Sequence, residues 1–145
     1  MIIRKMLLDD YKNVYDLWIN TPGMGLNAAD DSEAGIEKYL RRNPDTCFVA
    51  ERDGEIIGVI LSGHDGRRGL IYHLAVKPSE RGRGAGSALL GYATEALRKE
   101  GIGKIYIVVF ADNEAGNAFW EKRGFIIPDE SLYRAKNIIP VEKID

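Results

Sequence analysis

The chain has 145 residues, a formal net charge of −2 and a hydrophobic fraction of 45 %. Its length is typical of one domain, and we expect a single domain over residues 1–145. A nucleic-acid-binding protein normally carries a basic excess on one face, so the charge argues against that class. With one cysteine, an intramolecular disulfide is excluded and a structural zinc site lacks its usual ligands.

Cys47 lies in the apolar run 46–50, which predicts a buried, inert thiol. The segment 1–5 lacks the apolar part of a secretion signal, and no apolar run approaches the roughly 20 residues that a membrane helix needs. We therefore expect a cytoplasmic protein without a membrane span, a bound metal or a nucleic-acid partner.

The first half of the chain reads as a strand, two helices and an antiparallel meander. Apolar residues recur at helical spacing after the first strand, and β-branched residues then form three runs separated by short turns. The expected elements are a strand over 2–6, helices from Asp9 or Asp10 and over 32–42, and strands over 46–52, 55–63 and 70–76. Consecutive strands joined by such short turns pair antiparallel.

The second half reads as a β-α-β unit followed by a helix and two short strands. Apolar residues at i, i+3 and i+4 predict a helix over 85–97, and the near-continuous apolar run 104–110 predicts a strand buried on both faces. The remaining expected elements are a helix from Asp112 or Asn113 to Arg123 and strands over 125–127 and 133–139. With a right-handed crossover in the β-α-β unit, the fold class is a mixed α/β sheet.

A glycine-rich turn between strand 70–76 and helix 85–97 carries the strongest chemical signal. Its sequence is Arg81-Gly82-Arg83-Gly84-Ala85-Gly86-Ser87. Glycines allow positive φ and a close backbone approach, and free N–H groups at a helix start attract anions. Arginines add forked donors that match phosphate oxygens. The turn therefore predicts a phosphate-binding site.

Two common phosphate-binding patterns do not fit this turn. A P-loop needs a lysine after its second glycine, and no lysine follows Gly86. The dinucleotide fingerprint G-x-G-x-x-G also fails, because its sixth position is Ser87 counted from Gly82 and Leu89 counted from Gly84. A plain helix start would not need three glycines and two arginines.

The turn matches the R/Q-x-x-G-x-G/A signature of the GNAT family of N-acetyltransferases, which the chain resembles over essentially its whole length. The match runs from Arg81 to Gly86, and Leu74-Ala75-Val76-Lys77-Pro78 before it resembles the end of the family's strand. The segment from Asn113 to Phe125 is similar to a second signature, N-x-x-A-x-x-F-Y-E-K-x-G-F. The resemblance implies a GNAT-like fold, with a mixed, mostly antiparallel sheet, a central β-α-β unit, splayed parallel strands and about four helices.

The resemblance also implies acetyl-CoA as cosubstrate. The backbone of Leu74 and Val76 is expected to pair with the pantetheine arm, and the turn 81–87 to hold the pyrophosphate. The implied cofactor-binding residues are Leu74, Ala75, Val76, Arg81, Gly82, Arg83, Gly84, Ala85, Gly86, Ser87, Asn113 and Trp120. Asn113 reads equally well as the N-cap of the last helix.

The implied reaction is direct acetyl transfer to a primary amine, which must first lose the proton of its ammonium form. In the family a tyrosine commonly protonates the CoA thiolate. Trp120 stands at that position here, and an indole N–H is not a useful acid. The candidate substitutes are His73, Tyr72 and Tyr106. Strict alternation in strand 70–76 predicts that His73 faces the side of the sheet opposite to Tyr72.

Two functions remain open on the sequence. The chain is either an N-acetyltransferase for an amine of a small molecule or protein, or an acetyl-CoA-binding sensor or interaction domain without efficient turnover. Acidic side chains are candidates to line a pocket for a cationic amine, namely Asp30, Asp31, Glu55 and Asp65. A homodimer through the sheet edge or the last strands would fit the family.

Overall fold

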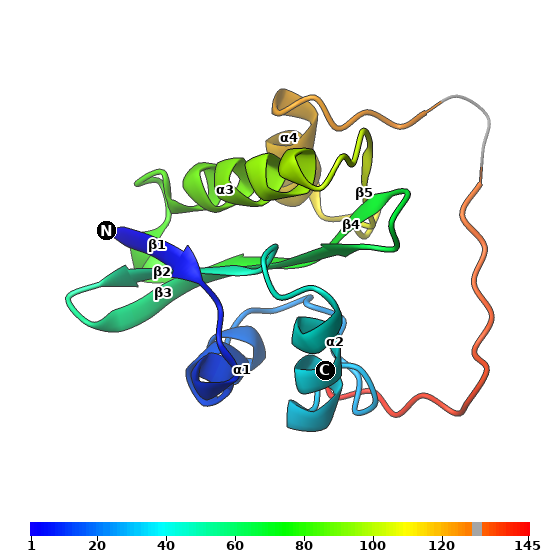
Figure 1. Cartoon of the computed structure of the whole chain (residues 1–145), viewed down its shortest axis with the longest axis horizontal. Coiled ribbons are helices and arrows are strands. Elements are labelled where there is room, and N and C mark those ends of the chain that lie inside the picture. The colour runs from blue at the N-terminus through cyan, green and yellow to red at the C-terminus, as the bar shows by residue number, and fades with distance from the viewer. Residues whose placement is uncertain (129–131) are drawn as a thin grey trace.

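The computed structural model describes residues 1–128 and 132–145, which form one sheet with helices on both faces. Helices α1 and α2 cover one face, and α3 and α4 lie over the other (Figure 1). The strands are β1 (Ile2–Lys5), β2 (Phe48–Arg52), β3 (Glu55–His64), β4 (Gly69–Val76) and β5 (Ile105–Ile107). The helices are α1 (Tyr11–Ile19), α2 (Glu33–Arg42), α3 (Ala85–Lys99) and α4 (Glu114–Lys122), with 3₁₀ turns at Leu8–Asp10 and Pro78–Glu80.

The strands lie in the order β1-β2-β3-β4-β5. The first four pair antiparallel as a meander, and β4 pairs in parallel with β5 through the α3 crossover. This arrangement confirms the mixed α/β class and the β-α-β unit expected from the sequence. Within the described residues, no helix has the length and apolar character needed to cross a membrane.

Local sequence signals account for several element boundaries. Ser32 Oγ accepts a hydrogen bond from Gly35 N–H at 3.1 Å and so caps α2, at the position where the sequence predicted this helix to begin. Asp53 and Gly54 have φ values of 54° and 78°, which the two-residue hairpin between β2 and β3 requires. These boundaries depend on residues that are neighbours in the sequence, and the prediction of them was therefore reliable.

Each face of the sheet packs against its own apolar cluster. Trp18 of α1 has no exposed surface and lies in the cluster under α1 and α2, whereas Leu89 of α3 lies in the cluster on the other face. Neighbouring residues of β3 point to opposite faces of the sheet. Val59 packs in the cluster under α1 and α2, and Ile60 packs in the cluster that contains Leu89. The sheet is therefore covered on both faces over its central strands.

Strand β4 contains a bulge that interrupts its alternation. His73 pairs with Leu61 of β3, and Ile71 pairs with the next residue of β3, so Tyr72 is an extra residue with no partner of its own. The pairing of β4 with β5 ends at Ile71 and Ile107, immediately before the bulge. A bulge bends its strand and increases the local twist. Beyond this point β4 and β5 are no longer paired.

Strand β5 is shorter and more exposed than the sequence predicts. The run 104–110 was expected to form a strand buried on both faces, but only Ile105–Ile107 pairs with β4, and Val108 and Phe110 are exposed. That prediction was wrong for two physical reasons. The bulge in β4 ends the pairing, and β5 is an edge strand within the described part of the chain.

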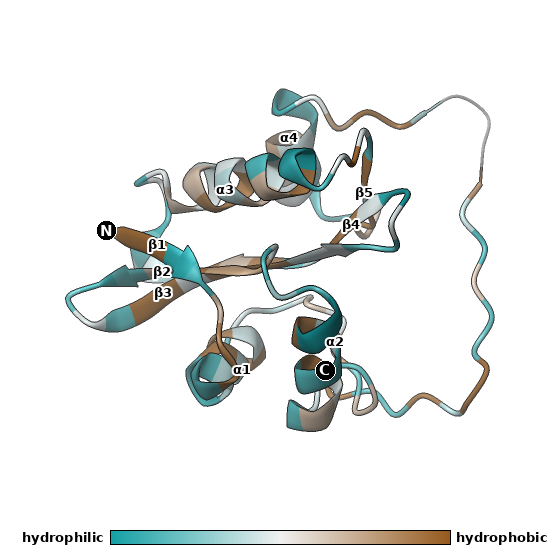
Figure 2. Ribbon diagram, viewed as in Figure 1, coloured by the Kyte–Doolittle hydropathy of each residue, from teal (hydrophilic) through white to brown (hydrophobic). Residues whose placement is uncertain are grey.

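The two strands predicted over 125–127 and 133–139 are absent from the sheet, and that prediction was also wrong. Residues 125–128 lead away from α4, and residues 132–145 run outside β5 to the layer of α1 and α2 (Figure 1). We call residues 132–141 the arm; Figure 2 shows apolar residues along it. High β propensity produces a strand only where the segment meets a partner edge, and the arm pairs with no strand among the described residues.

Candidate active site

A cradle of backbone N–H groups lies where β4 leads into α3. Gly82 and Gly84 have φ values of 76° and 88°, in the left-handed region that favours glycine. Gly84 is the N-cap residue of α3, and no side chain caps this helix. The bond from Ala88 N–H to Gly84 O measures 3.0 Å, and the N–H groups that precede it point out of the helix end. This end of α3 is suited to bind an anion.

The two arginines predicted to bind phosphate flank this cradle and are exposed. Arg81 Nε donates to Val76 O at 3.3 Å, and Arg83 pairs with Glu80 at 3.2 Å. Glu80 also accepts from Arg52 Nε at 2.6 Å, and this hydrogen bond lowers the pKa of the Glu80 carboxyl. The ionised Glu80 therefore holds Arg83 beside the turn, while Arg81 lies against the end of β4.

A third arginine reaches the cradle from the end of α4, and sequence reasoning missed it. Arg123 Nε lies 3.2 Å from Ser87 Oγ, and the guanidinium group stacks 3.6 Å from the centroid of the Phe119 ring. Lys122 and Arg98 line the same groove between α3 and α4. Arg123 occupies a variable position of the second signature, so no spacing rule indicated that it would join the first turn of α3.

The last residues of β4 present, next to the cradle, backbone groups that pair with no described strand, although Val76 O accepts a hydrogen bond from Arg81. Lys77 N–H donates to Ile57 O of β3 at 2.8 Å. Successive strand residues direct their N–H and C=O groups to alternate edges, so those of Leu74 and Val76 point away from β3. Among the described residues, no strand pairs with that edge of β4 beyond Ile71. An extended ligand with amide groups can hydrogen-bond there as an added strand.

Tyr72 and His73 face the same side of the sheet. The Tyr72 ring lies edge-on to Tyr39 of α2, with 5.6 Å between centroids, and the His73 ring lies 4.9 Å from that of Trp18 in α1. Strict alternation predicted opposite sides, and that prediction was wrong. The bulge explains the difference, because it places two residues of β4 where regular pairing allows one.

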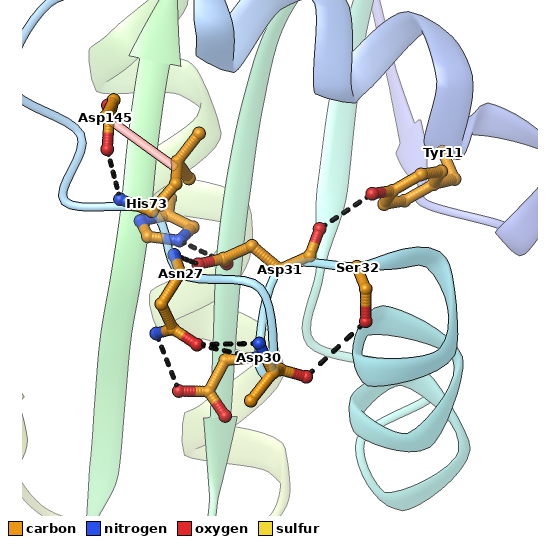
Figure 3. A network of polar contacts seen from close by, with 9 residues as sticks. Tyr11, Asn27, Asp30, Asp31, Ser32, His73 and Asp145 are labelled. Carbon is orange, nitrogen blue, oxygen red and sulfur yellow. Dashed lines mark hydrogen bonds and ion pairs between the residues drawn. The ribbon is translucent and has the colours of Figure 1, made fainter. Parts of the chain in front are cut away.

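His73 belongs to a buried polar network beneath the loop that precedes α2 (Figure 3). Its Nε2 lies 2.8 Å from Asp31 Oδ1, and the two residues are 8 % and 3 % exposed. The other Asp31 oxygen accepts from Asn27 N–H at 2.9 Å, and Asp31 O accepts from Tyr11 OH at 2.7 Å. His73 Nδ1 is buried and has no hydrogen-bond partner among the described residues. The imidazole thus anchors the loop to β4 and has no exposed nitrogen.

The same loop is tied to the C-terminus on its other side. Ala28 N–H donates to Glu142 O at 2.8 Å, and Ile144 N–H donates to Leu26 O at 3.0 Å. Leu26 N–H also donates to Asp145 Oδ1 at 2.6 Å, and Figure 3 shows the Asp145 side chain reaching the loop. The loop over 26–31 is therefore held between β4 and the end of the chain.

The two candidate tyrosines are partly exposed. Tyr72 keeps 55 % of its surface exposed, and burial of the remainder raises the pKa of its phenol, with smaller contributions from Asp30 and Tyr133. A phenol is protonated at neutral pH even at its ordinary pKa, so Tyr72 carries a proton for a developing anion, and the raised pKa makes it a weaker acid than a free tyrosine. Tyr106 lies on β5, where the amino group of Lys104 is 5.4 Å from the centroid of its ring.

Three of the residues predicted to bind the cofactor make contacts with other parts of the protein itself. Ala75 is buried in the cluster under α1 and α2. Asn113 Oδ1 accepts from a backbone N–H of the first turn of α4 at 2.9 Å, which confirms its interpretation as an N-cap. Trp120 packs edge-on against Phe119 and Phe125, with 5.0 Å between ring centroids in both pairs. Its indole thus belongs to an aromatic cluster between α4 and the sheet.

The acidic candidates for an amine pocket are all engaged with groups of the chain. Asp31 contacts His73, Asp30 accepts from Asn27, Glu55 pairs with Lys77, and Asp65 accepts from the backbone of Arg67 and Arg68. Asp31 is buried and belongs to the polar network, whereas Asp30 beside it is exposed on the loop.

The thiol of Cys47 is buried, and this burial raises its pKa to about 12. Its Sγ donates to Ser62 O at 3.1 Å, and the prediction of a buried, inert thiol is confirmed. In residues 1–128 and 132–145, no three His, Cys, Asp or Glu side chains are grouped so that they could hold a metal ion.

The model of the Acetyltransferase (GNAT) family matches residues 11–125. An acetyltransferase of Sodalis glossinidius is 37 % identical over 139 residues, covering 96 % of this chain and 96 % of the relative. Ard1 from Thermoplasma volcanium has the same fold, with a TM-score of 0.78 at 24 % identity over 87 % of this chain and 82 % of that one. The paiA N-acetyltransferase of Thermoplasma acidophilum, solved with coenzyme A, gives 0.76 at 21 % identity over 90 % and 92 %. The chain therefore belongs to the acetyltransferase (GNAT) family and is an acyltransferase.

Proposed function

We propose that this protein is an N-acetyltransferase that moves an acetyl group from acetyl-CoA directly to a primary amine of a small molecule or a protein. One observation carries the proposal: the unpaired edge of β4 at Leu74 and Val76 runs directly into the glycine cradle. Pantetheine is an extended chain with amide groups that leads to an anionic pyrophosphate. Its amides would therefore lie along the edge of β4 and the pyrophosphate at the cradle. The complex of the paiA enzyme with coenzyme A supports this assignment.

In this proposal the pyrophosphate lies at the start of α3. The N–H groups of Ala85 and Gly86 and the positive end of the helix would neutralise part of its charge. Arg81 and Arg83 would contribute from the turn, and Arg123 from α4. Glu80 supports the site indirectly, because its carboxylate keeps Arg83 close to the turn.

The chemical step forms a C–N bond and breaks a C–S bond. The free amine attacks the acetyl carbon and its nitrogen loses one proton to solvent, while the sulfur leaves as a thiolate that takes up one proton from a donor. The donor regains its proton from solvent, so the products are an amide and a free thiol. We assign the proton that the thiolate takes up to the Tyr72 phenol, because a phenol is protonated at neutral pH and the bulge turns it to the side of α1 and α2. Trp120 has no part in proton transfer here, because its ring packs between two phenylalanines.

The acceptor amine has to lose a proton before it attacks. His73 is one of the residues that the sequence offers for proton transfer, and an imidazole can act as a base, but its Nδ1 is buried and its Nε2 contacts Asp31. We propose that His73 positions the loop over 26–31 and that solvent at the exposed side of Tyr72 takes the proton. The exposed carboxylate of Asp30 on this loop would attract a cationic amine.

The experiment that tests this function mixes purified protein, acetyl-CoA and a panel of amines, and measures free thiol. The panel covers diamines, amino sugars, amino acids and peptides with a free N-terminus. We expect at least one class to release CoA in equal amount to the acetylated amine. If no class does so while acetyl-CoA still raises the melting temperature, the second function, a binding domain without turnover, replaces the first.

A further inference from the structure

Two ion pairs tie the hairpin between β2 and β3 to the segment that leads into the glycine cradle. Arg52, the last residue of β2, and Glu55, the first of β3, are partners across this hairpin. Arg52 Nε lies 2.6 Å from Glu80 Oε1, and Glu55 pairs with the amino group of Lys77. Lys77 and Glu80 both lie on the short segment between β4 and the cradle. The hairpin is therefore fastened to the edge of the site at two points.

The pair of Arg52 and Glu80 is the more sheltered of the two. The side chains of Arg52 and Glu80 are 27 % and 14 % exposed, against 42 % and 63 % for those of Lys77 and Glu55. Water and salt screen an exposed ion pair, so that it contributes little, whereas a partly buried pair keeps more of its attraction. A change of charge at Arg52 should therefore act strongly on Glu80.

Glu80 places a negative charge beside a site that is suited to an anion. Its second oxygen, Oε2, lies 3.2 Å from the guanidinium group of Arg83, and the next residue after Arg83 is Gly84, the N-cap of α3. A glutamate is ionised at neutral pH at its ordinary pKa, and the hydrogen bond from Arg52 lowers that pKa further. Like charges repel, so an unmatched carboxylate here would disfavour a phosphate group and would also cancel the charge of Arg83.

We propose that Arg52 is a positioning residue of the cofactor site, which neutralises Glu80 from β2 so that Arg83 keeps its positive charge for the pyrophosphate. This inference rests on the proposed function, because that function puts the pyrophosphate at the cradle. The two oxygens of Glu80 are divided between two arginines, so the three side chains together carry one net positive charge. Without Arg52, Glu80 and Arg83 form a neutral pair, and the site loses that charge.

Calorimetric titration with coenzyme A tests this role. Arg52→Gln removes the charge and keeps part of the side-chain stem, and we expect it to weaken the binding of coenzyme A by about five- to tenfold. The anionic end of the cofactor is the same before and during the reaction, so kinetics should show a raised KM for acetyl-CoA with an unchanged kcat. Arg41→Gln is the matched control on α2. It removes the same charge from an exposed pair with Glu37, and the affinity should stay unchanged.

Neutralising Glu80 as well should rescue the Arg52 variant. In the double variant, Arg52→Gln with Glu80→Gln, Arg83 is an unopposed cation, so the net charge of the three positions returns to that of the wild type. We expect the double variant to bind coenzyme A within about threefold of the wild type and more tightly than Arg52→Gln alone. If Arg52 only supported the fold of the turn, removing its partner too would give no such recovery.

The outcomes separate this inference from the proposed function. Unchanged affinity in Arg52→Gln overturns the inference, and so does a double variant that binds no more tightly than Arg52→Gln. A lowered kcat at an unchanged KM for acetyl-CoA also overturns it. All three results leave the cofactor site in place, because the wild type still binds coenzyme A. A wild type that binds no coenzyme A overturns the proposed function, and the inference with it.

Discussion

His73 Nε2 lies 2.8 Å from Asp31 Oδ1, and this buried contact joins β4 to the loop that precedes α2. Asp31 makes three further hydrogen bonds: it accepts from Asn27 N–H and from Tyr11 OH, and its own N–H donates to Asn27 O. This one residue therefore connects β4, the loop and α1. The C-terminal residues 142–145 also form hydrogen bonds with this loop. The pair therefore positions the loop that we assign to the acceptor amine.

Replacing His73 by alanine should lower the free energy of unfolding by about 1–3 kcal/mol, because it leaves one oxygen of the buried Asp31 side chain without its hydrogen-bond partner. Urea denaturation measures this loss. His64→Ala is the control: the half-buried His64 ring accepts a hydrogen bond from Gly66 N–H and lies 3.9 Å from Glu100, and its loss should cost about 1 kcal/mol or less. Equal losses in the two variants would show that the buried pair is not a structural anchor.

The same His73 variant separates positioning from cofactor binding. His73 faces α1 and α2, whereas the cradle lies at the start of α3. We expect calorimetry to give an unchanged affinity for acetyl-CoA and kinetics to give a raised KM for the acceptor. A large loss of acetyl-CoA affinity in the folded variant would contradict this assignment.

Gly84→Val should weaken acetyl-CoA binding about tenfold or more, because a β-branched residue does not adopt the φ of 88° that shapes the cradle. Calorimetry measures the affinity. Gly91→Ala is the matched control on the exposed face of α3, where an added Cβ meets nothing within 4 Å. It should keep the affinity and stabilise the helix by roughly 0.5–1 kcal/mol.

Arg81→Ala removes a cation whose Nε lies beside Val76 O at the end of β4. We expect weaker acetyl-CoA binding that depends less steeply on salt than in the wild type, because a charge contact to the pyrophosphate is lost. Titrations at two salt concentrations check this. Arg68→Ala, in the turn before β4, should leave both quantities unchanged, and equal effects of the two variants would argue against the assigned site.

Tyr72→Phe should lower kcat by about 10²-fold if its phenol protonates the leaving thiolate, with little change in acetyl-CoA affinity. Steady-state kinetics with the acceptor found in the amine panel measures the effect. Trp120→Phe keeps an aromatic ring between Phe119 and Phe125, and kcat should stay within about twofold. A large loss of kcat in Trp120→Phe, together with an unchanged kcat in Tyr72→Phe, would show that Trp120 and not Tyr72 takes part in the reaction.

Asp10 should make the fold sensitive to acid. Burial alone would raise the pKa of its carboxyl, but hydrogen bonds from the Arg4 side chain and Leu7 N–H outweigh that effect and hold the pKa below its ordinary value. A carboxyl with a lowered pKa stabilises the folded state above the unfolded pKa of about 3.9, and this stability is lost as the pH falls through the folded pKa.

Urea denaturation from about pH 6 to about pH 2 checks this sign. The free energy of unfolding of the wild type should fall at the acid end. Asp10→Asn should be less stable at neutral pH, and its free energy of unfolding should fall less steeply as the pH is lowered. Asp9→Asn, at the exposed neighbouring position, is the control and should follow the wild type. Parallel curves for wild type and Asp10→Asn would contradict the expected linkage.

Most elements, and the glycine cradle with them, could be predicted from the sequence because their causes are local. The helical spacing over 85–97, the serine that caps α2 and the glycines at 82 and 84 act on residues a few positions away. The same holds for the buried thiol of Cys47, whose apolar neighbours follow it directly in β2. These features follow from backbone conformation and side-chain pattern, which the order of residues determines directly.

The tertiary structure decided the features that depend on how distant segments pair. The bulge at Tyr72 arises from the register between β3 and β4, and it turns Tyr72 and His73 to one side of the sheet. Arg123 joins the cradle only because α4 packs against the first turn of α3. The arm stays out of the sheet because a strand needs a partner edge as well as β propensity. Register and partner choice are properties of the assembled sheet, and local sequence patterns do not determine them.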